Sequence, residues 1–200
     1  MHECSALPPQ RPTTQAAEGL PRWRWTVADI ERIAAHGFFT EFDQFELLGG
    51  EMVPMTSPAG RRHETIRIEL AQHLAQLTRK DFLVAQRPQF NLNPDTFVKP
   101  DILVHLRGIK TYDLKGAEAL LVVEVAETSL SYDLKVKLPI YASHGVREYW
   151  VINAVTRVTT VHRQPAGDIY TDRKEFAPTD RLVPSLAPAL AVSLSELDLD

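Results

Sequence analysis

The sequence lacks the features that mark secreted or membrane proteins. Its single cysteine, Cys4, excludes an internal disulfide and cannot by itself build a zinc site. We therefore expect a reducing, cytoplasmic location. The apolar runs, such as Ala119–Val123, are too short to cross a bilayer. Residues 1–15 have no basic start followed by an apolar stretch, so no secretory signal is expected.

An excess of basic residues is also missing. The 22 lysines and arginines are outnumbered by 26 aspartates and glutamates, which gives a net charge of −4. This balance argues against a protein that coats nucleic acid through bulk charge, although a local basic patch or a metal ion can still meet phosphate. Two hundred residues are enough for one well-buried α/β domain and few for two.

The first part of the chain divides into a tail and the start of an ordered domain. Residues 1–22 carry four prolines among polar residues without an apolar period, so they predict a disordered tail. We expect residues 23–200 to form a single domain. Thr26 and Asp29 resemble a capping box and predict a short helix. Apolar runs on both sides of Gly49-Gly50 predict a β-hairpin.

The rest of the chain alternates strands and helices. Apolar residues spaced three or four apart predict an amphipathic helix over 63–78. A second helix is predicted over 133–143, where Pro139 should produce a kink. Strands are predicted over 82–90, 98–106, 120–126, 147–153, 156–163 and 189–192. This order predicts an α/β or α+β fold with one mixed sheet.

Glu124 is the most informative residue. It lies inside the apolar run Leu121–Ala126, which otherwise suits the centre of a sheet. A carboxylate buried there without a partner costs several kcal/mol, on the order of other buried charges. Two explanations remain open from this residue alone: a functional carboxylate, or one at the strand end that meets an arginine or solvent.

A second carboxylate, Asp101, opens the preceding strand. If the two strands are neighbours, Asp101 and Glu124 reach one point, where they repel each other unless a cation lies between them. Only oxygen ligands are available there, which favours Mg²⁺ or Mn²⁺ over zinc. Such an ion, with positions open to water and phosphate, is typical of phosphodiester chemistry.

The helix that follows Glu124 brings a lysine into reach. Asp133, Lys137 and Tyr141 are spaced four residues apart and form one stripe on this helix. Lys137 can point back toward the carboxylates, where it would orient water and stabilise developing negative charge. Taken alone, the stripe is more typical of a solvated Asp-Lys pair.

These residues resemble a known family. The resemblance rests on the ordered segments Glu46-Leu47-x-x-Gly50-Glu51-x-Val53-x-Met55, Pro100-Asp101, Glu124-Val125-Ala126-Glu127-Thr128-Ser129, Asp133-x-x-x-Lys137-x-x-x-Tyr141-Ala142 and Gly145-Val146-x-Glu148-Tyr149-Trp150. They are similar to the Uma-type restriction endonuclease family of the PD-(D/E)xK superfamily, over residues 24–197. This likeness implies a restriction endonuclease-like α/β core, with a central mixed β-sheet flanked by helices and an N-terminal helix and β-hairpin.

The resemblance also implies roles for single residues. Asp101 and Glu124, with the backbone carbonyl of Val125, would hold the divalent ion. The superfamily has a Glu-x-Lys motif, whereas position 126 here is alanine. The likeness implies that Lys137 replaces that lysine, because its flexible stem can reach the site from a neighbouring element.

Two accessory residues complete the expected site. Glu51 is a candidate third acid from the hairpin, and it equally fits an exposed position after the Gly-Gly turn. His63 matches a histidine that the family usually carries and is a candidate contact to phosphate or metal-bound water. It equally fits a histidine that packs the helix start against the hairpin.

The leading interpretation is a Mg²⁺- or Mn²⁺-dependent endonuclease that hydrolyses DNA and associates with no membrane. A homodimer suits a reaction that cuts both strands, because two-fold dimers are the commonest oligomers. The alternative is a non-catalytic DNA-binding or protein-interaction module on a nuclease-derived scaffold. A phosphoesterase for a small substrate ranks last, because no glycine-rich phosphate loop is present.

Overall fold

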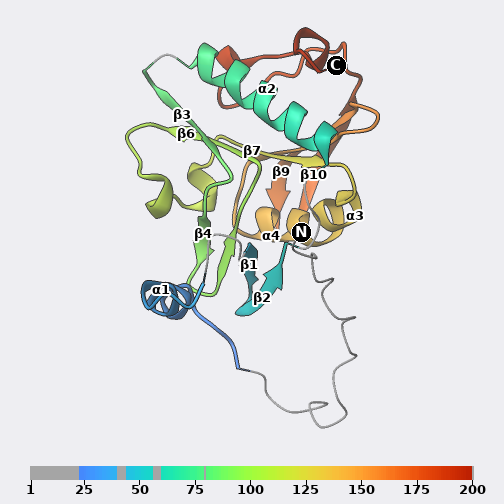
Figure 1. The fold of residues 1–200 in the computed structure, drawn as a ribbon. Coiled ribbons are helices and arrows are strands. Elements are labelled where there is room, and N and C mark those ends of the chain that lie inside the picture. Colours follow the sequence, from blue (N-terminus) through green and yellow to red (C-terminus); the bar gives the residue numbers. More distant parts are fainter. Residues whose placement is uncertain (1–22, 40–43, 56–59, 79, 200) are drawn as a thin grey trace, which may run out of the picture.

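The computed structural model describes residues 23–39, 44–55, 60–78 and 80–199. The predicted tail at 1–22, with Cys4, lies outside these residues. The described chain has two β-sheets and several helices (Figure 1). The strands are β1 (Phe45–Leu48), β2 (Glu51–Pro54), β3 (Phe82–Gln86), β4 (Phe90–Asn93), β5 (Thr96–Val98), β6 (Ile102–Leu106), β7 (Leu121–Ala126), β8 (Glu148–Asn153), β9 (Thr159–Ala166) and β10 (Ile169–Phe176).

The helices are α1 (Val27–Ala35), α2 (Arg61–Leu77), α3 (Leu130–Tyr132) and α4 (Leu138–Ser143), with a π-helical turn, Asp133–Lys137, between the last two. Short 3₁₀ turns are η2 (Thr111–Asp113), η3 (Gly116–Glu118), η5 (Pro188–Leu190) and η6 (Leu194–Glu196). The capping box predicted at the start of α1 is present, since the Thr26 hydroxyl accepts from the Asp29 N–H at 3.1 Å.

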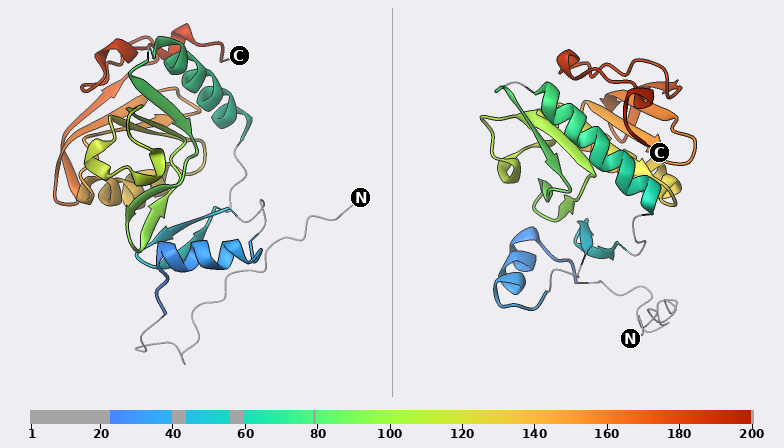
Figure 2. Two further views of the ribbon diagram at one scale, coloured as in Figure 1. Left: turned by 90° about the vertical axis from the view of Figure 1, so that its left-hand side faces the viewer. Right: turned by 45° about the horizontal axis from the view of Figure 1, so that its top comes forward.

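The larger sheet has six strands in the order β10-β9-β8-β7-β6-β3. Only β7 and β8 are parallel; the other neighbours are antiparallel. All six residues of β7 are buried. The reason is coverage on both faces: α2 and the C-terminal segment lie over one face, and α3 and α4 lie over the other (Figure 2).

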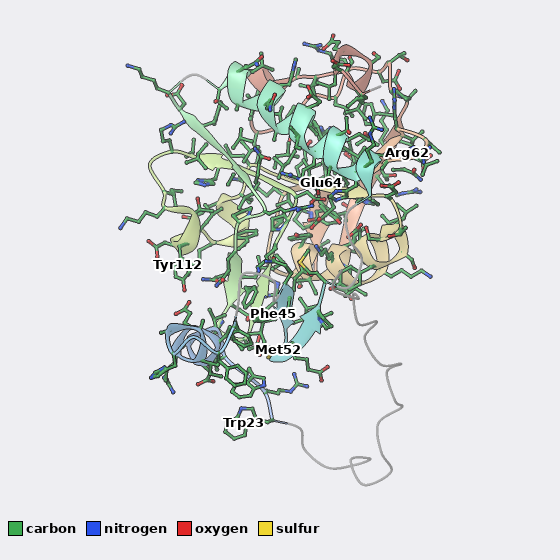
Figure 3. The ribbon with its side chains drawn as sticks, in the orientation of Figure 1. Trp23, Phe45, Met52, Arg62, Glu64 and Tyr112 are labelled. Carbon is green, nitrogen blue, oxygen red and sulfur yellow. The ribbon has the colours of Figure 1, made fainter. Side chains whose placement is uncertain are left out.

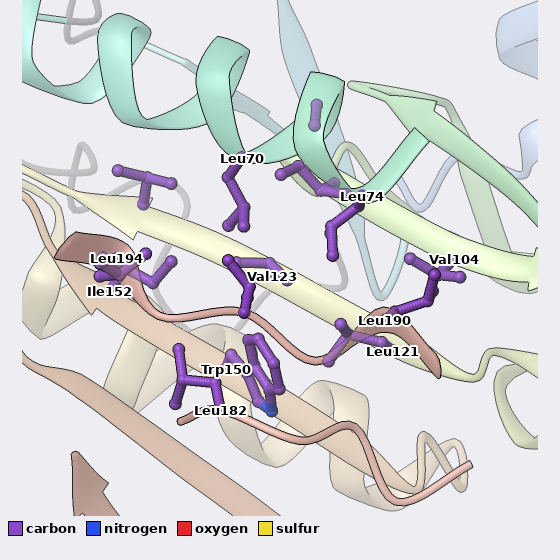
Figure 4. Close-up of a cluster of buried hydrophobic side chains, with 14 of the residues drawn as sticks. Leu70, Leu74, Val104, Leu121, Val123, Trp150, Ile152, Leu182, Leu190 and Leu194 are labelled. Atoms are coloured by element: carbon purple, nitrogen blue, oxygen red, sulfur yellow. The ribbon is translucent and has the colours of Figure 1, made fainter. Parts of the chain in front are cut away.

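The main hydrophobic cluster lies between α2, the larger sheet and the C-terminal segment (Figure 4). Leu70 and Leu74 of α2 are fully buried in the same cluster as Val123 of β7 and Trp150 of β8. Each fully buried leucine contributes about 1.5–3 kcal/mol through removal of apolar surface from water. The amphipathic helix predicted over 63–78 is therefore confirmed, with its apolar stripe on the sheet.

A buried carboxylate ties the C-terminal segment to this cluster. Glu148 of β8 is fully buried and accepts hydrogen bonds from Trp150 Nε1 and Arg163 Nη2, each at 2.7 Å. Its other oxygen accepts from the Ser185 backbone N–H at 2.7 Å and from the Ser185 hydroxyl. The negative charge of Glu148 is thus stabilised by hydrogen-bond donors from two strands and from the segment that covers them.

The smaller sheet has the order β2-β1-β5-β4. The predicted hairpin is present as β1 and β2, with Gly49 and Gly50 both at positive φ in its turn. Its pairing with β5 was not predicted. The strand predicted over 82–90 is broken at Arg87, whose φ is 47°, and the chain passes from one sheet to the other there.

The fold class is confirmed: a central mixed sheet flanked by helices, preceded by a helix and a hairpin. The strands form two sheets and not the one mixed sheet that was predicted. Besides the break at Arg87, other local features differ from the predictions. The strand predicted over 98–106 is β5 and β6, separated at Pro100. The strand predicted over 189–192 is wrong, since this segment holds η5 and a single bridge from Val192 to Leu182. The strand β10 was not predicted, because most of its residues are exposed and polar.

Pro139 changes the predicted helix over 133–143. Proline has no N–H and its ring collides with the carbonyl four residues earlier. Here the turn before it is widened, so that the Leu138 N–H bonds the Asp133 carbonyl five residues back. The expected kink is therefore a π-helical turn, a feature found frequently at functional sites.

Candidate active site

Asp101 and Glu124 lie near each other where β6 and β7 meet. Asp101 comes directly before β6, whose Ile102 pairs with Val123 of β7. The Asp101 carboxylate accepts from the N–H of Val125, the residue after Glu124. Both acids are buried, and both line a cavity of about 410 Å³. The larger sheet, the hairpin and the start of α2 contribute the other walls.

Asp101 is held as a carboxylate by its neighbours. Its Oδ2 accepts from the Val125 backbone N–H at 2.9 Å and lies 2.9 Å from His63 Nε2. Burial raises the pKa of Asp101, but His63, the Val125 N–H and Lys137 outweigh burial and lower it below its ordinary value. Burial likewise lowers the pKa of His63, and Asp101 more than offsets this, so the pKa of His63 is raised.

Lys137 reaches the acid pair from the π-helical turn. Its Nζ lies 2.9 Å from Glu124 Oε1, and the Tyr141 hydroxyl donates to the same oxygen at 2.8 Å. Lys137 is 4% exposed and Asp133 is 3% exposed, so the stripe is not a solvated ion pair. Burial opposes a charged lysine, but Glu124, Glu46 and Asp133 raise the pKa of Lys137, so it stays an ammonium.

Glu124 has the opposite electrostatic situation from Asp101. Complete burial is the largest cause that raises its pKa well above the ordinary value. Lys137 lowers the pKa, whereas the nearby carboxylates of Asp101, Asp133 and Glu46 raise it further. The two acids therefore have pKa values displaced in opposite directions, a pattern common in active sites.

The third acid of the site is Glu46. It is 1% exposed on β1, and its Oε1 lies 2.9 Å from Lys137 Nζ. The sequence had pointed to Glu51 for this place, but Glu51 is exposed on β2 and is not among the residues that line the cavity. A carboxylate within the apolar strand Phe45–Leu48 is the same signal that singled out Glu124, and it identifies Glu46 equally well.

The start of α2 forms the rim of the cavity. Gly60 has no side chain to cap the helix, and Glu127, just beyond β7, accepts from the His63 backbone N–H at 3.2 Å instead. A Cβ at Gly60 would lie 2.0 Å from Glu127 Oε2, so a larger residue here would displace the Glu127 carboxylate from the His63 N–H. Arg61 and Arg62 follow, both exposed; Arg62 lies at the outer end of the helix (Figure 3).

The donor set at the acid pair fits a hard divalent cation. Asp101 and Glu124 offer only carboxylate oxygens, which suit Mg²⁺ or Mn²⁺. Within the part of the chain that the structure describes, no three His, Cys, Asp or Glu side chains are arranged to hold a metal. An ion at this place would take most ligands from water and phosphate, as Mg²⁺ commonly does.

The fold is shared with a solved structure. It resembles the crystal structure of a "putative nuclease belonging to DUF820 from Anabaena variabilis", with a TM-score of 0.65 and 19% identity over 84% of this chain and 96% of that one. The family model Uma2, described as "Putative restriction endonuclease", matches residues 28–196. The chain belongs to this family, which confirms the resemblance noted in the sequence and supports a nuclease function.

Other comparisons add little. The type IIG restriction endonuclease BpuSI gives a TM-score of 0.36 and 12% identity, over 55% of this chain and 13% of that one, and a likeness this low carries no argument. A search of curated protein sequences finds none that matches. Among the described helices, none combines the length and apolar character needed to span a membrane.

Proposed function

We propose that this protein is a Mg²⁺- or Mn²⁺-dependent endonuclease that hydrolyses DNA phosphodiester bonds through Asp101, Glu124 and Lys137. One observation carries the proposal: two carboxylates and a buried ammonium, from three separate elements, meet in one cavity. Membership of a family described as restriction endonucleases supports DNA as the substrate.

Some residues of the site would bind the ion, and Lys137 would contact phosphate or water. Asp101 and Glu124, with the backbone carbonyl of Val125, would hold the ion, which polarises phosphate and activates water when bound. Lys137 gives hydrogen bonds to Glu124 and Glu46 and keeps a third N–H for a phosphate oxygen or the attacking water. An ammonium fixed in a buried position stabilises the charge that develops in the transition state.

Basic residues around the cavity suit a phosphate backbone. Arg87 and Lys99 line the cavity, and Arg61 and Arg62 are exposed beside its rim. His63, held through Asp101, is placed as an accessory contact to phosphate or water. A net charge of −4 gives no general attraction for DNA, so these local groups must supply it. A two-fold dimer would present two such sites to opposite strands.

The test is cleavage of supercoiled plasmid with Mg²⁺ or Mn²⁺. We expect nicking and linearisation by the wild type and by the exposed control Glu31→Gln, and none by Asp101→Ala or Lys137→Ala. Calorimetric titration with Mn²⁺ should give a site that Glu124→Ala removes. Cleavage that survives both substitutions would refute the site. DNA binding that ignores chelator, with no cleavage under any metal, would identify a non-catalytic module instead.

A further inference from the structure

We infer that Glu46 is a positioning residue for the Lys137 ammonium, so that the smaller sheet supplies part of the site built on the larger one. The inference rests on the proposed function, since it assigns a task within that reaction. It concerns a residue outside the acid pair and lysine, on a strand that contributes no residue to that trio.

The Glu46 carboxylate gathers donors from three parts of the chain. Oε1 accepts from the Lys99 backbone N–H at 2.8 Å and lies 2.9 Å from Lys137 Nζ. Oε2 accepts from the Tyr132 hydroxyl at 3.0 Å. Lys99 lies between β5 and β6, and Tyr132 ends α3. Glu46 is thus fixed by backbone on one side and by a phenol on the other.

This arrangement fixes an otherwise flexible side chain. Lysine carries its charge on four rotatable carbons, and a single contact with Glu124 leaves the ammonium free to swing. A second carboxylate defines the direction of the remaining N–H. The second contact matters more once a cation engages Glu124, because that oxygen then interacts less strongly with Lys137. Misplacement of a reacting group by about 1 Å can cost roughly 100-fold in rate.

The same contacts argue against Glu46 as a ligand of the ion. Both of its oxygens already accept hydrogen bonds or ion pairs from protein donors. Asp101 and Glu124 enter the cavity from beside β6 and from β7 of the larger sheet, whereas Glu46 reaches it from the other sheet. Positioning and ion binding therefore make different predictions for the Glu46→Gln variant.

The experiment compares wild type, Glu46→Gln, Tyr132→Phe and Glu31→Gln, the last an exposed charge-matched control in the N-terminal part. We expect Glu46→Gln to lower the single-turnover cleavage rate roughly 10- to 100-fold at saturating DNA and Mg²⁺. DNA affinity and Mn²⁺ affinity should stay within about twofold of wild type, as for a group that touches neither. Glu46→Asp should recover less than half of the loss, because its shorter side chain retracts from Lys137.

Several results would overturn the inference. A cleavage rate for Glu46→Gln within twofold of wild type would do so, as would a parallel loss of Mn²⁺ affinity, which would make Glu46 an ion ligand. If Glu46→Gln does not fold, the Tyr132→Phe variant tests the inference in its place. This variant keeps the contact between Glu46 and Lys137 but removes the hydrogen bond to Glu46 Oε2. We expect a rate loss of roughly two- to tenfold, and an unchanged rate contradicts the inference.

If the wild type cleaves no DNA, the proposed function is refuted, but the inference that Glu46 holds the Lys137 ammonium in place is not. The ammonium of Lys137 can then be followed by ¹⁵N NMR of lysine-labelled protein, with its signal assigned by its absence in Lys137→Met. An ammonium that is held in place by these contacts exchanges its protons with water slowly. Glu46→Gln should shift or broaden this signal and Glu31→Gln should not. A signal that is the same in both variants would show that Glu46 does not hold Lys137.

Discussion

Replacement of Lys137 by methionine should destabilise the protein strongly. The ammonium is buried among the carboxyl groups of Glu46, Glu124 and Asp133, and its positive charge offsets their negative charge. Removal of one partner of a buried ion pair costs about 3–5 kcal/mol, because an uncompensated charge remains in a poorly solvated place. For a chain of this length that loss lowers Tm by on the order of 10 °C.

Replacement of Glu124 by glutamine should have the opposite effect on stability. Glutamine still accepts hydrogen bonds from Lys137 and Tyr141, and the ammonium keeps its contact with Glu46. The pKa of Glu124 is raised chiefly by burial. The unfolded chain therefore releases this proton more readily, and the wild type loses stability as pH rises above 4.5. Glu124→Gln escapes this loss and should gain about 1–2 kcal/mol at pH 8, less at pH 5.

Urea unfolding at pH 5 and pH 8 measures both effects, with Glu31→Gln as the exposed control. Both variants should lack cleavage activity, so the comparison separates stability from function. The reasoning fails if Lys137→Met is as stable as wild type at pH 8. It also fails if Glu124→Gln is less stable than the wild type at pH 8 by more than about 1 kcal/mol, a typical cost of a lost hydrogen bond.

Three further predictions concern the fold. Burial lowers the pKa of His162 to about 4. Acidification from pH 7 to pH 5 should therefore lower the free energy of unfolding of the wild type by about 2 kcal/mol. His162→Gln should not show this loss, and urea titrations at the two pH values will measure the difference. Gly116→Ala should cost about 1–3 kcal/mol in thermal unfolding, because its Cβ would lie 2.1 Å from the His144 carbonyl oxygen, while the open position Gly108→Ala should not. Leu70→Ala should cost about 2–5 kcal/mol in the same assay, and a cost below about 1 kcal/mol would contradict the packing described for α2.

Local patterns predicted the buried strands of the larger sheet, though not the exposed strand β10. The apolar run at β7 predicted a strand covered on both faces, and the stripe on α2 predicted a helix packed on that sheet. These features depend on residues close in sequence, so periodicity reveals them. The break at Arg87 was not predictable in this way, because only tertiary contacts explain a non-glycine residue at positive φ.

The candidate site was predictable to a similar extent. Asp101, Glu124 and Lys137 were recognised from one segment of about 40 residues, and the structure brings all three to one cavity. Glu46 carries the same local signal as Glu124, a carboxylate in an apolar strand, but its contact with Lys137, 91 positions away, depends on how the smaller sheet packs, which no local pattern reveals. Glu51 was predicted as an acid that reaches the site from the hairpin, yet alternation along a hairpin decides which acid faces inward.

The Glu148 contact with Ser185 has a consequence for how the protein is made. Residues 182–194 close the main hydrophobic cluster over Trp150, and the ribosome synthesises them after everything that they cover. Until they emerge, Trp150 and the leucines of α2 lack part of their apolar cover, and Glu148 lacks two of its donors. This cluster can therefore be completed only after the segments that it covers have been made, and apolar surface that stays exposed until then favours aggregation.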